Sequence, residues 1–308
     1  MRKINVKSDR FRRNKVKNDA QQGNNDVSKK SYRWLKITAI MVVVIALACL
    51  FMQIGTWSTH GAECSFVPDY EKEDISAVLE KSELTDSDYE FLYRQTGLTQ
   101  TGIERELRKG ERGKLKIQEI SAAFFSPREM VRNDIAAWMC IDVIRGTVPN
   151  VSLETGDVIV SASTHISSLR IGHAGLVVDG EKGAVLQATA YGQNTMIGHV
   201  TDFTSRINFM VLRPKVSEEI KLKVAEYAKE NLVGIPYSAF AGVITHKNTI
   251  PKTQCAHVVW YAYKHFGVDL VGENKQMILP YDLANSDMLE TVQVFGFDPQ
   301  KKWNKLIF

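Results

Sequence analysis

Cysteine is scarce in this chain of 308 residues, and four cysteines do not suggest a disulfide-stabilised scaffold at this length. They stand at Cys49, Cys64, Cys140 and Cys255, and no two of them form the Cys-x-x-Cys pair of structural zinc sites. We therefore expect no metal ion and no cofactor. A disulfide between Cys64 and Cys140 stays open, because their spacing does not test it.

A basic surface is also missing from most of the chain, although the formal net charge is +4. Residues 1–36 hold twelve Lys or Arg against three Asp, so the remaining residues hold 27 basic and 32 acidic side chains. The basic excess belongs to an N-terminal tail, and we expect no nucleic-acid partner. With 44% hydrophobic and 24% charged residues, the chain has the composition of a globular protein.

Charge is absent from one long run near the N-terminus. Residues 1–34 are rich in Lys, Arg, Asn, Gln and Ser, and we expect them to form a disordered tail. The run that follows, 37–54, has eighteen uncharged residues bracketed by Trp34 and Trp57, which is enough to span a bilayer. We predict a transmembrane helix over 35–57. The positive-inside rule places the tail in the cytoplasm and the C-terminal part outside the membrane.

Two other interpretations of this run remain. A cleaved signal peptide has the same polarity, but its apolar core is usually shorter, and Thr59-His-Gly61 is a poor cleavage site. A lipoprotein signal would end at Cys49, yet Ala46-Leu-Ala-Cys49 is an imperfect match and apolar residues continue past it. We adopt the uncleaved anchor, which makes this a single-pass protein of the cell membrane.

Strand-like alternation is lacking between residues 58 and 150, so we predict a small helical region there. Thr85-Asp-Ser-Asp is a helix-start signal and Gly97 is a stop signal. A longer helical pattern with a proline kink runs over 117–144. Cys140 lies within it among apolar residues, where a buried core thiol is expected.

Short strands and glycine-bearing turns begin at residue 151. They are followed by an amphipathic helix over 218–232 and by a second helix that starts at Cys255. The predicted strands lie at 153–160, 171–178, 184–188 and 208–213. Strands followed by packed helices predict an α+β domain over 151–308, with an antiparallel sheet packed on helices.

Cys255 is the candidate nucleophile. It opens an apolar helical stretch, and the unpaired N–H groups and dipole of a helix start favour a thiolate. An ordinary thiol with a pKa of about 8.5 is only slightly ionised at pH 7, so this help decides whether it reacts. A buried structural thiol is the competing interpretation for a single cysteine.

A cysteine nucleophile needs a base, and His173 at the start of a predicted strand is the candidate. If this strand and the next pair as a hairpin, Gln187 comes beside His173 and can orient its imidazole. Tyr237, in the turn after Pro236, is the candidate oxyanion donor. His165 is a reserve base, and a metal ion held by these two histidines and the thiol is disfavoured.

Six short segments carry a family resemblance. They are Gly156-Asp157, Gly172-His-Ala-Gly175, Val185-Leu-Gln-Ala188, Gly234-Ile-Pro-Tyr237, Gln254-Cys-Ala-His-Val-Val-Trp-Tyr-Ala-Tyr263 and Pro280-Tyr-Asp-Leu283. In this order they resemble the circularly permuted papain-like amidases of the YiiX/YycO type, relatives of the NlpC cell-wall peptidases and of lecithin:retinol acyltransferase. Over residues 150–308 the resemblance implies a permuted papain-like fold, with Cys255 as nucleophile, His173 as base and Gln187 at the third polar position.

Two residues depart from the family's pattern. Ala256 follows the cysteine where Ser is common, and Gln187 is uncharged where Glu or His is common, so it stabilises an imidazolium less. The resemblance implies an extracytoplasmic cysteine hydrolase that cleaves an amide, with cell-wall peptide as the expected substrate. The alternatives are a hydrolase or acyltransferase acting on a lipid or ester acyl group, and a non-catalytic envelope module that binds wall or partner peptides.

Overall fold

The computed structural model describes residues 32–55, 65–136, 139–167, 169–272, 275–300 and 303, and it divides the chain into two compact units, Met1–Gln53 and Ile54–Phe308. An N-terminal helix, Tyr32–Gly55, has 24 residues, and its most apolar 18-residue stretch has a mean hydropathy of 2.7, so it is long and apolar enough to cross a membrane. This confirms the predicted apolar helix. Its orientation across a membrane stays a prediction, and the rest of the basic tail and Trp57 lie outside the described residues.

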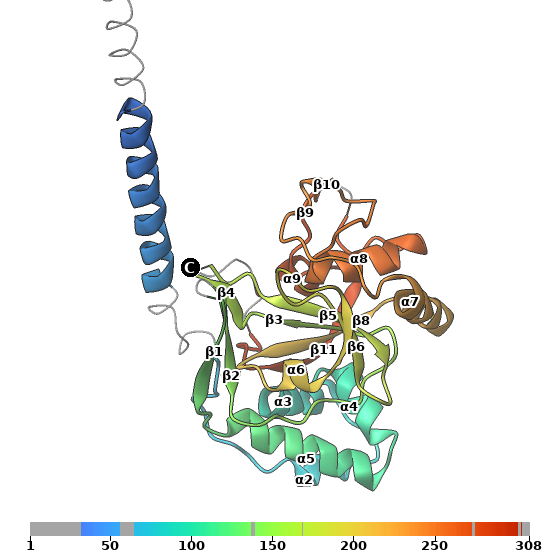
Figure 1. Cartoon of the computed structure of the whole chain (residues 1–308). Helices are drawn as coiled ribbons and strands as arrows, with labels where there is room; N and C mark the ends of the chain where they lie inside the picture. The colour runs from blue at the N-terminus through green and yellow to red at the C-terminus, as the bar shows by residue number, and fades with distance from the viewer. Residues whose placement is uncertain are drawn as a thin grey trace, which may run out of the picture. The chain divides into compact units, whose positions relative to one another are not determined.

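The second unit is built on a six-stranded antiparallel sheet with the strand order β11-β8-β3-β5-β6-β7 (Figure 1). Its strands are β3 (Val158–Ser161), β5 (His173–Asp179), β6 (Ala184–Gln187), β7 (Met196–His199), β8 (Phe209–Pro214) and β11 (Leu289–Phe295). The predicted strands correspond to β3, β5, β6 and β8, whereas the sequence did not predict the two edge strands β7 and β11. The α+β class with an antiparallel sheet is confirmed.

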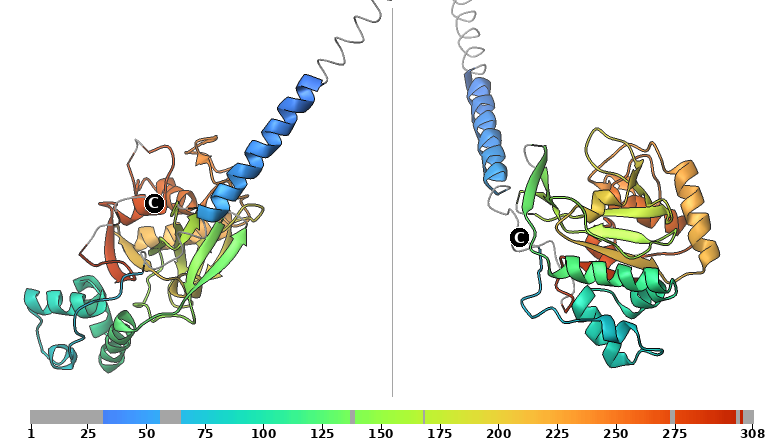
Figure 2. Two further views of the ribbon diagram at one scale, coloured as in Figure 1. Left: turned by 90° about the vertical axis from the view of Figure 1, so that its left-hand side faces the viewer. Right: turned by 90° about the horizontal axis from the view of Figure 1, so that it is seen from below.

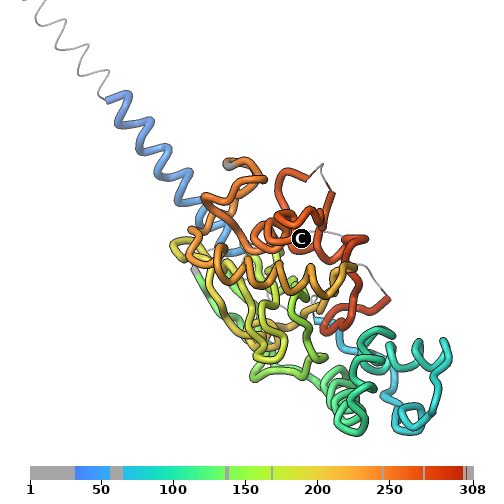
Figure 3. The backbone as a smooth tube through the Cα atoms, turned by 90° about the vertical axis from the view of Figure 1, so that its right-hand side faces the viewer, coloured from blue at the N-terminus to red at the C-terminus, as the bar shows by residue number. Residues whose placement is uncertain are grey.

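Helices cover both faces of this sheet, as Figure 2 and Figure 3 show. They are α2 (Ser76–Leu79), α3 (Asp86–Thr96), α4 (Gln100–Leu107), α5 (Glu111–Phe125), α6 (Thr201–Thr204), α7 (Glu218–Asn231), α8 (Cys255–His265) and α9 (Pro280–Ala284). Successive strand residues point to opposite faces. Val158 and Val160 pack in one core cluster with residues of α7 and α8, and Ile159 packs in another with residues of α3 to α5. The helical region and the sheet therefore share a core.

Capping residues fix the ends of α3. Thr85 and Asp88 form a reciprocal capping box at its start, and Gly97 ends it with φ of 71°, as the sequence predicts. The turn that follows lies against β11: the Val294 N–H donates to the Gly97 carbonyl at 2.8 Å, and the Thr99 N–H donates to the Val292 carbonyl at 3.1 Å. This turn joins the helical region to the last strand of the sheet.

The helix predicted over 117–144 is wrong in its second half. α5 ends at Phe125, and the chain then forms an antiparallel hairpin of β1 (Met130–Ala136) and β2 (Met139–Ile144). β4 (Thr164–Ile166) pairs with β2 and completes a three-stranded sheet. The periodicity of 130–144 does not reveal the hairpin, because β4, the strand that pairs with β2, comes later in the chain, after β3. Two very short strands, β9 (Ala241–Gly242) and β10 (Thr245–His246), pair in the segment before α8.

Candidate active site

Cys255 opens α8, as the sequence predicts. Gln254 is the N-cap: its Oε1 accepts the Ala256 N–H at 2.8 Å, and its Nε2 donates to the Ile278 carbonyl. The first turn of α8 is therefore tied to the segment that leads into α9. This holds the thiol at the end of a buried helix, with 8% of Cys255 exposed.

Backbone N–H groups surround the sulfur. The thiol of Cys255 donates to Gln254 Oε1 at 3.5 Å, and the backbone N–H groups of Ala174 in β5 and Ala256 in α8 lie near enough to the sulfur to stabilise its thiolate. Burial raises the pKa of Cys255, whereas these N–H groups and the charge of Arg206 lower it. Burial has the larger effect. The resting group is therefore the neutral thiol, which needs a base in order to react.

A chain of hydrogen bonds runs from His173 through Gln187 to Asp202. His173 Nε2–H donates to Gln187 Oε1 at 2.9 Å, and Gln187 Nε2 donates to Asp202 Oδ2 at 2.6 Å. The hairpin of β5 and β6 brings Gln187 beside His173, which confirms that predicted pairing. The sequence did not predict Asp202. It lies in the four-residue helix α6, whose position depends on tertiary packing rather than on a local signal.

Asp202 sets the direction of this chain. A carboxylate can only accept hydrogen bonds, so Gln187 turns its NH₂ group to Asp202 and its carbonyl oxygen to His173. His173 then carries its proton on Nε2 and has the lone pair of Nδ1 as a proton acceptor. Burial and the charge of Arg206 lower the pKa of His173 to about 3, against the opposing effect of Gln187. The imidazole is neutral at pH 7, so Nδ1 is able to accept a proton, but a pKa this low makes it a weak base in this buried position.

Arg206 brings a buried positive charge to the same place. Its guanidinium lies 5.5 Å from the centre of the Phe203 ring, which stacks on the His173 ring at 5.2 Å. Its Nε donates to a backbone carbonyl at 2.8 Å, and its Nη1 donates to two hydroxyl groups at 2.8 and 3.0 Å. These hydrogen-bond partners are neutral, and the charge of Arg206 interacts with Asp202 and with Cys255, whose pKa it lowers.

Tyr237 lies close enough to Cys255 for their charges to interact. Its segment pairs with Thr253 just before α8, and its ring meets that of Tyr191 edge-on, with centroids 6.3 Å apart. Burial and the neighbouring Cys255 raise the pKa of Tyr237, so the phenol keeps its proton. A protonated hydroxyl in this position is able to donate to an oxyanion, so the predicted role fits the position and stays a prediction.

Within the described residues, no hydrogen bond joins the Cys255 thiol to the His173 imidazole. The His173 ring faces Phe203 in the core cluster of α3 to α5, whereas Ala174 points to the other face and packs in the cluster of α8. The two residues come nearest to each other at the start of β5, where the backbone N–H of Ala174, the residue after His173, lowers the pKa of Cys255. Proton transfer therefore requires the His173 ring to turn toward the sulfur.

A cavity of about 360 Å³ opens beside the hydrogen-bond chain. His173, Gln187, Asp202 and Arg206 all line it. Its remaining lining includes apolar side chains of the β1–β2 hairpin, namely Ile135, Met139, Ile141 and Val143. The hairpin that the sequence did not predict thus forms one wall of this cavity, whose lining does not include Cys255 or Tyr237.

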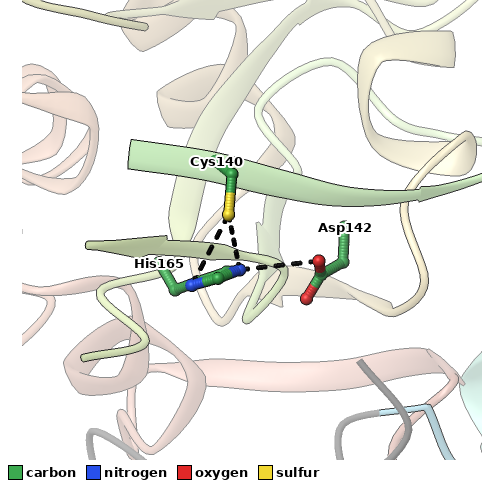
Figure 4. A group of neighbouring side chains, drawn as sticks. All are labelled: Cys140, Asp142 and His165. Atoms are coloured by element: carbon green, nitrogen blue, oxygen red, sulfur yellow. Dashed lines mark hydrogen bonds and ion pairs between the residues drawn. The ribbon is translucent and has the colours of Figure 1, made fainter. Parts of the chain in front are cut away.

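His165, the predicted reserve base, belongs to a second cluster with Cys140 and Asp142 (Figure 4). Its Nε2 lies 2.7 Å from Cys140 Sγ, and its Nδ1–H donates to the Ser167 carbonyl at 2.8 Å. Both ring nitrogens are engaged there, so the reserve role is wrong. Cys140 is a buried free thiol, as predicted, and Cys64 lies outside the described residues.

The sequence matches no protein-family model, no curated protein and no solved structure. The chain is α+β with antiparallel sheets and one N-terminal apolar helix, and the likeness to permuted papain-like amidases rests on the sequence motifs alone.

Proposed function

We propose that this protein is a membrane-anchored cysteine hydrolase with a permuted papain-like fold, which cleaves an amide through an acyl-thioester. The position of Cys255 carries the proposal. The thiol begins a helix, and nearby backbone N–H groups and the charge of Arg206 stabilise its thiolate. The neighbouring strand β5 carries a histidine whose tautomer is set by Gln187 and Asp202. A purely structural thiol requires none of these features.

The reaction begins when His173 Nδ1 takes the proton of Cys255 as the sulfur attacks the carbonyl carbon of the substrate. The carbonyl π electrons move to oxygen, and the hydroxyl of Tyr237 donates to this oxyanion. The imidazolium returns the proton to the departing amine as the C–N bond breaks. Water, deprotonated by His173, then attacks the thioester, and the thiolate leaves and regains a proton.

Cell-wall peptide is the substrate that the family resemblance and the expected extracytoplasmic location favour. A second candidate, a lipid or ester acyl group, is favoured by the cavity beside His173. The side chains of Ile135, Ile141 and Val143 give that cavity an apolar wall suited to an acyl chain.

Alkylation of Cys255 in the full-length protein, held in detergent, tests the catalytic thiol. We expect a haloacetamide to label Cys255 at pH 7 at least about tenfold faster than in His173→Ala, because general bases contribute on this scale or more. Cys49→Ser is the control, since it removes a thiol of the N-terminal helix and leaves Cys255 labelling unchanged. The proposed enzyme activity would be refuted if Cys255 were labelled only near the pKa of an ordinary thiol, about 8.5, and at the same rate in wild type and His173→Ala.

Product analysis then identifies the substrate. Purified cell wall and lipid esters are offered to wild-type protein and to Cys255→Ser. New amino termini in the wall digest support the amidase, and free fatty acid supports the second candidate. Binding of wall peptide without turnover by a protein whose Cys255 is not activated identifies a non-catalytic module.

A further inference from the structure

Cys140, Asp142 and His165 project from one face of the three-stranded sheet (Figure 4). Cys140 and Asp142 are two residues apart on β2, so they share a face, and the register places His165 of β4 directly opposite Cys140. One ligand-type atom from each residue lies within 4.8 Å of the other two, and all three side chains are buried.

The backbone orients the imidazole toward the other two groups. His165 Nδ1–H donates to the Ser167 carbonyl, which leaves Nε2 facing Cys140 Sγ. Among the described residues, Ser167 is the only one other than glycine with a positive φ, at 53°. Ser167 adopts this unfavourable conformation two residues after His165, and its carbonyl fixes the tautomer of that histidine. Histidines that bind metals are held in the same way, with one ring nitrogen donating to a carbonyl and the other facing the ion.

The carboxylate is held in a matching way. Arg170 Nη1 lies 2.8 Å from Asp142 Oδ2, and Asp142 Oδ1 lies 3.5 Å from His165 Nε2. On a tetrahedral zinc ion, nitrogen and oxygen ligands stand about 3.4 Å apart, and nitrogen and sulfur ligands about 3.6 Å. The carboxylate already fits this spacing. Cys140 Sγ lies 2.7 Å from His165 Nε2, about 0.9 Å closer than the nitrogen–sulfur spacing on a zinc ion. The sulfur would therefore move away from the imidazole by this amount when the ion binds.

We propose that Cys140, Asp142 and His165 bind a first-row divalent transition-metal ion such as Zn²⁺. A thiolate with an imidazole and a carboxylate selects such an ion over Mg²⁺ or Ca²⁺, which prefer oxygen ligands. On binding, the S–H bond of Cys140 breaks, a sulfur–metal bond forms and one proton is released to solvent. The ion joins β2 to β4 and so fixes the hairpin that forms one wall of the cavity beside His173.

Cobalt titration of the full-length protein in detergent tests the site. After removal of metal by a chelator, we expect one Co²⁺ per chain, with the intense near-ultraviolet absorption of a thiolate–cobalt bond, and displacement by Zn²⁺. Cys140→Ser removes this band and lowers the affinity by more than about 100-fold, the upper end of the loss for outer-shell residues. Cys255→Ser is the matched control and leaves the band unchanged.

Thermal unfolding gives a second readout. Stoichiometric Zn²⁺ raises the Tm of the metal-free wild-type protein and leaves that of Asp142→Asn, a variant of nearly equal size, less affected. A band that survives Cys140→Ser and disappears in Cys255→Ser overturns the proposal. So does a wild-type protein with neither a thiolate–cobalt band nor a Zn²⁺-dependent Tm, in which case the three residues form a hydrogen-bonded network only.

Discussion

The hydrogen-bond chain from His173 through Gln187 to Asp202 can be broken by changing Asp202 and restored by changing Gln187. Asp202→Ala removes the group that accepts from the Gln187 NH₂ at 2.6 Å. The amide is then free to turn over and to present NH₂ to His173. In that arrangement the imidazole must accept at Nε2 and carry its proton on Nδ1, which is the wrong tautomer for taking the proton of Cys255.

The size of the effect follows from the lost interaction. A hydrogen bond to a charged group contributes about 1.5–3 kcal/mol. Asp202 is exposed, so the lower end applies, and about 1.5 kcal/mol corresponds to a rate about tenfold lower. Gln187→Glu in the Asp202→Ala background repairs the defect, because a carboxylate can only accept, whichever way it is turned. We expect the double variant to react as fast as wild type or faster.

The assay is the second-order rate of Cys255 alkylation at pH 7, followed by mass spectrometry of the labelled peptide. It needs no substrate and therefore does not depend on the choice between peptide and lipid. Equal Tm values across the three proteins confirm that α6 stays folded without the Asp202 side chain. An Asp202→Ala rate equal to wild type, or a double variant no faster than Asp202→Ala, would show that this chain does not set the tautomer.

Three further predictions follow from the same site. Tyr237→Phe lowers turnover about 100-fold, which is the cost of losing one oxyanion donor. It leaves the rate of Cys255 alkylation unchanged, because alkylation forms no oxyanion. A parallel loss in both assays would contradict the oxyanion role. The folded-state pKa of His173, about 3, lies below its unfolded value of about 6.5, so the unfolded chain binds the extra proton between these values. Stability in urea therefore falls as pH drops below about 6.5, by at most about 1.4 kcal/mol per pH unit, and His173→Gln shows a shallower fall. Gly175→Ala places a Cβ 2.5 Å from Val185 Cγ1 and 2.9 Å from Phe203 Cζ. The substitution therefore lowers the free energy of unfolding in urea by about 1–3 kcal/mol. An unchanged free energy of unfolding would mean that β5 and β6 move apart easily.

The elements that the sequence predicts well are those whose ends are fixed by neighbouring residues. The Thr85 capping box and Gly97 bound α3, and the apolar spacing after Cys255 defines α8. The position of Gln187 beside His173 was also predictable, because a short turn joins their strands and leaves few ways to pair them.

The features that the sequence did not reveal depend on partners far away in the chain. The apolar pattern of 130–144 suits a helix or a strand, and pairing with β4 decides between them. In the same way, β11 becomes a strand because it pairs with β8. Asp202 and the neighbours of Cys140 come from separate segments, and only the folded chain brings them to their partners.

The contact between the turn at Gly97 and β11 has a consequence for biosynthesis. The helices α3 to α5 are made early, yet their apolar faces share a core with β11 residues such as Val292, near the end of the chain. During synthesis these helices emerge long before the strand that covers them. Non-local contacts of this kind slow folding and leave apolar surface exposed in the meantime. A chain cut short before Leu289 would keep its candidate catalytic residues and still lack the strand that closes this core.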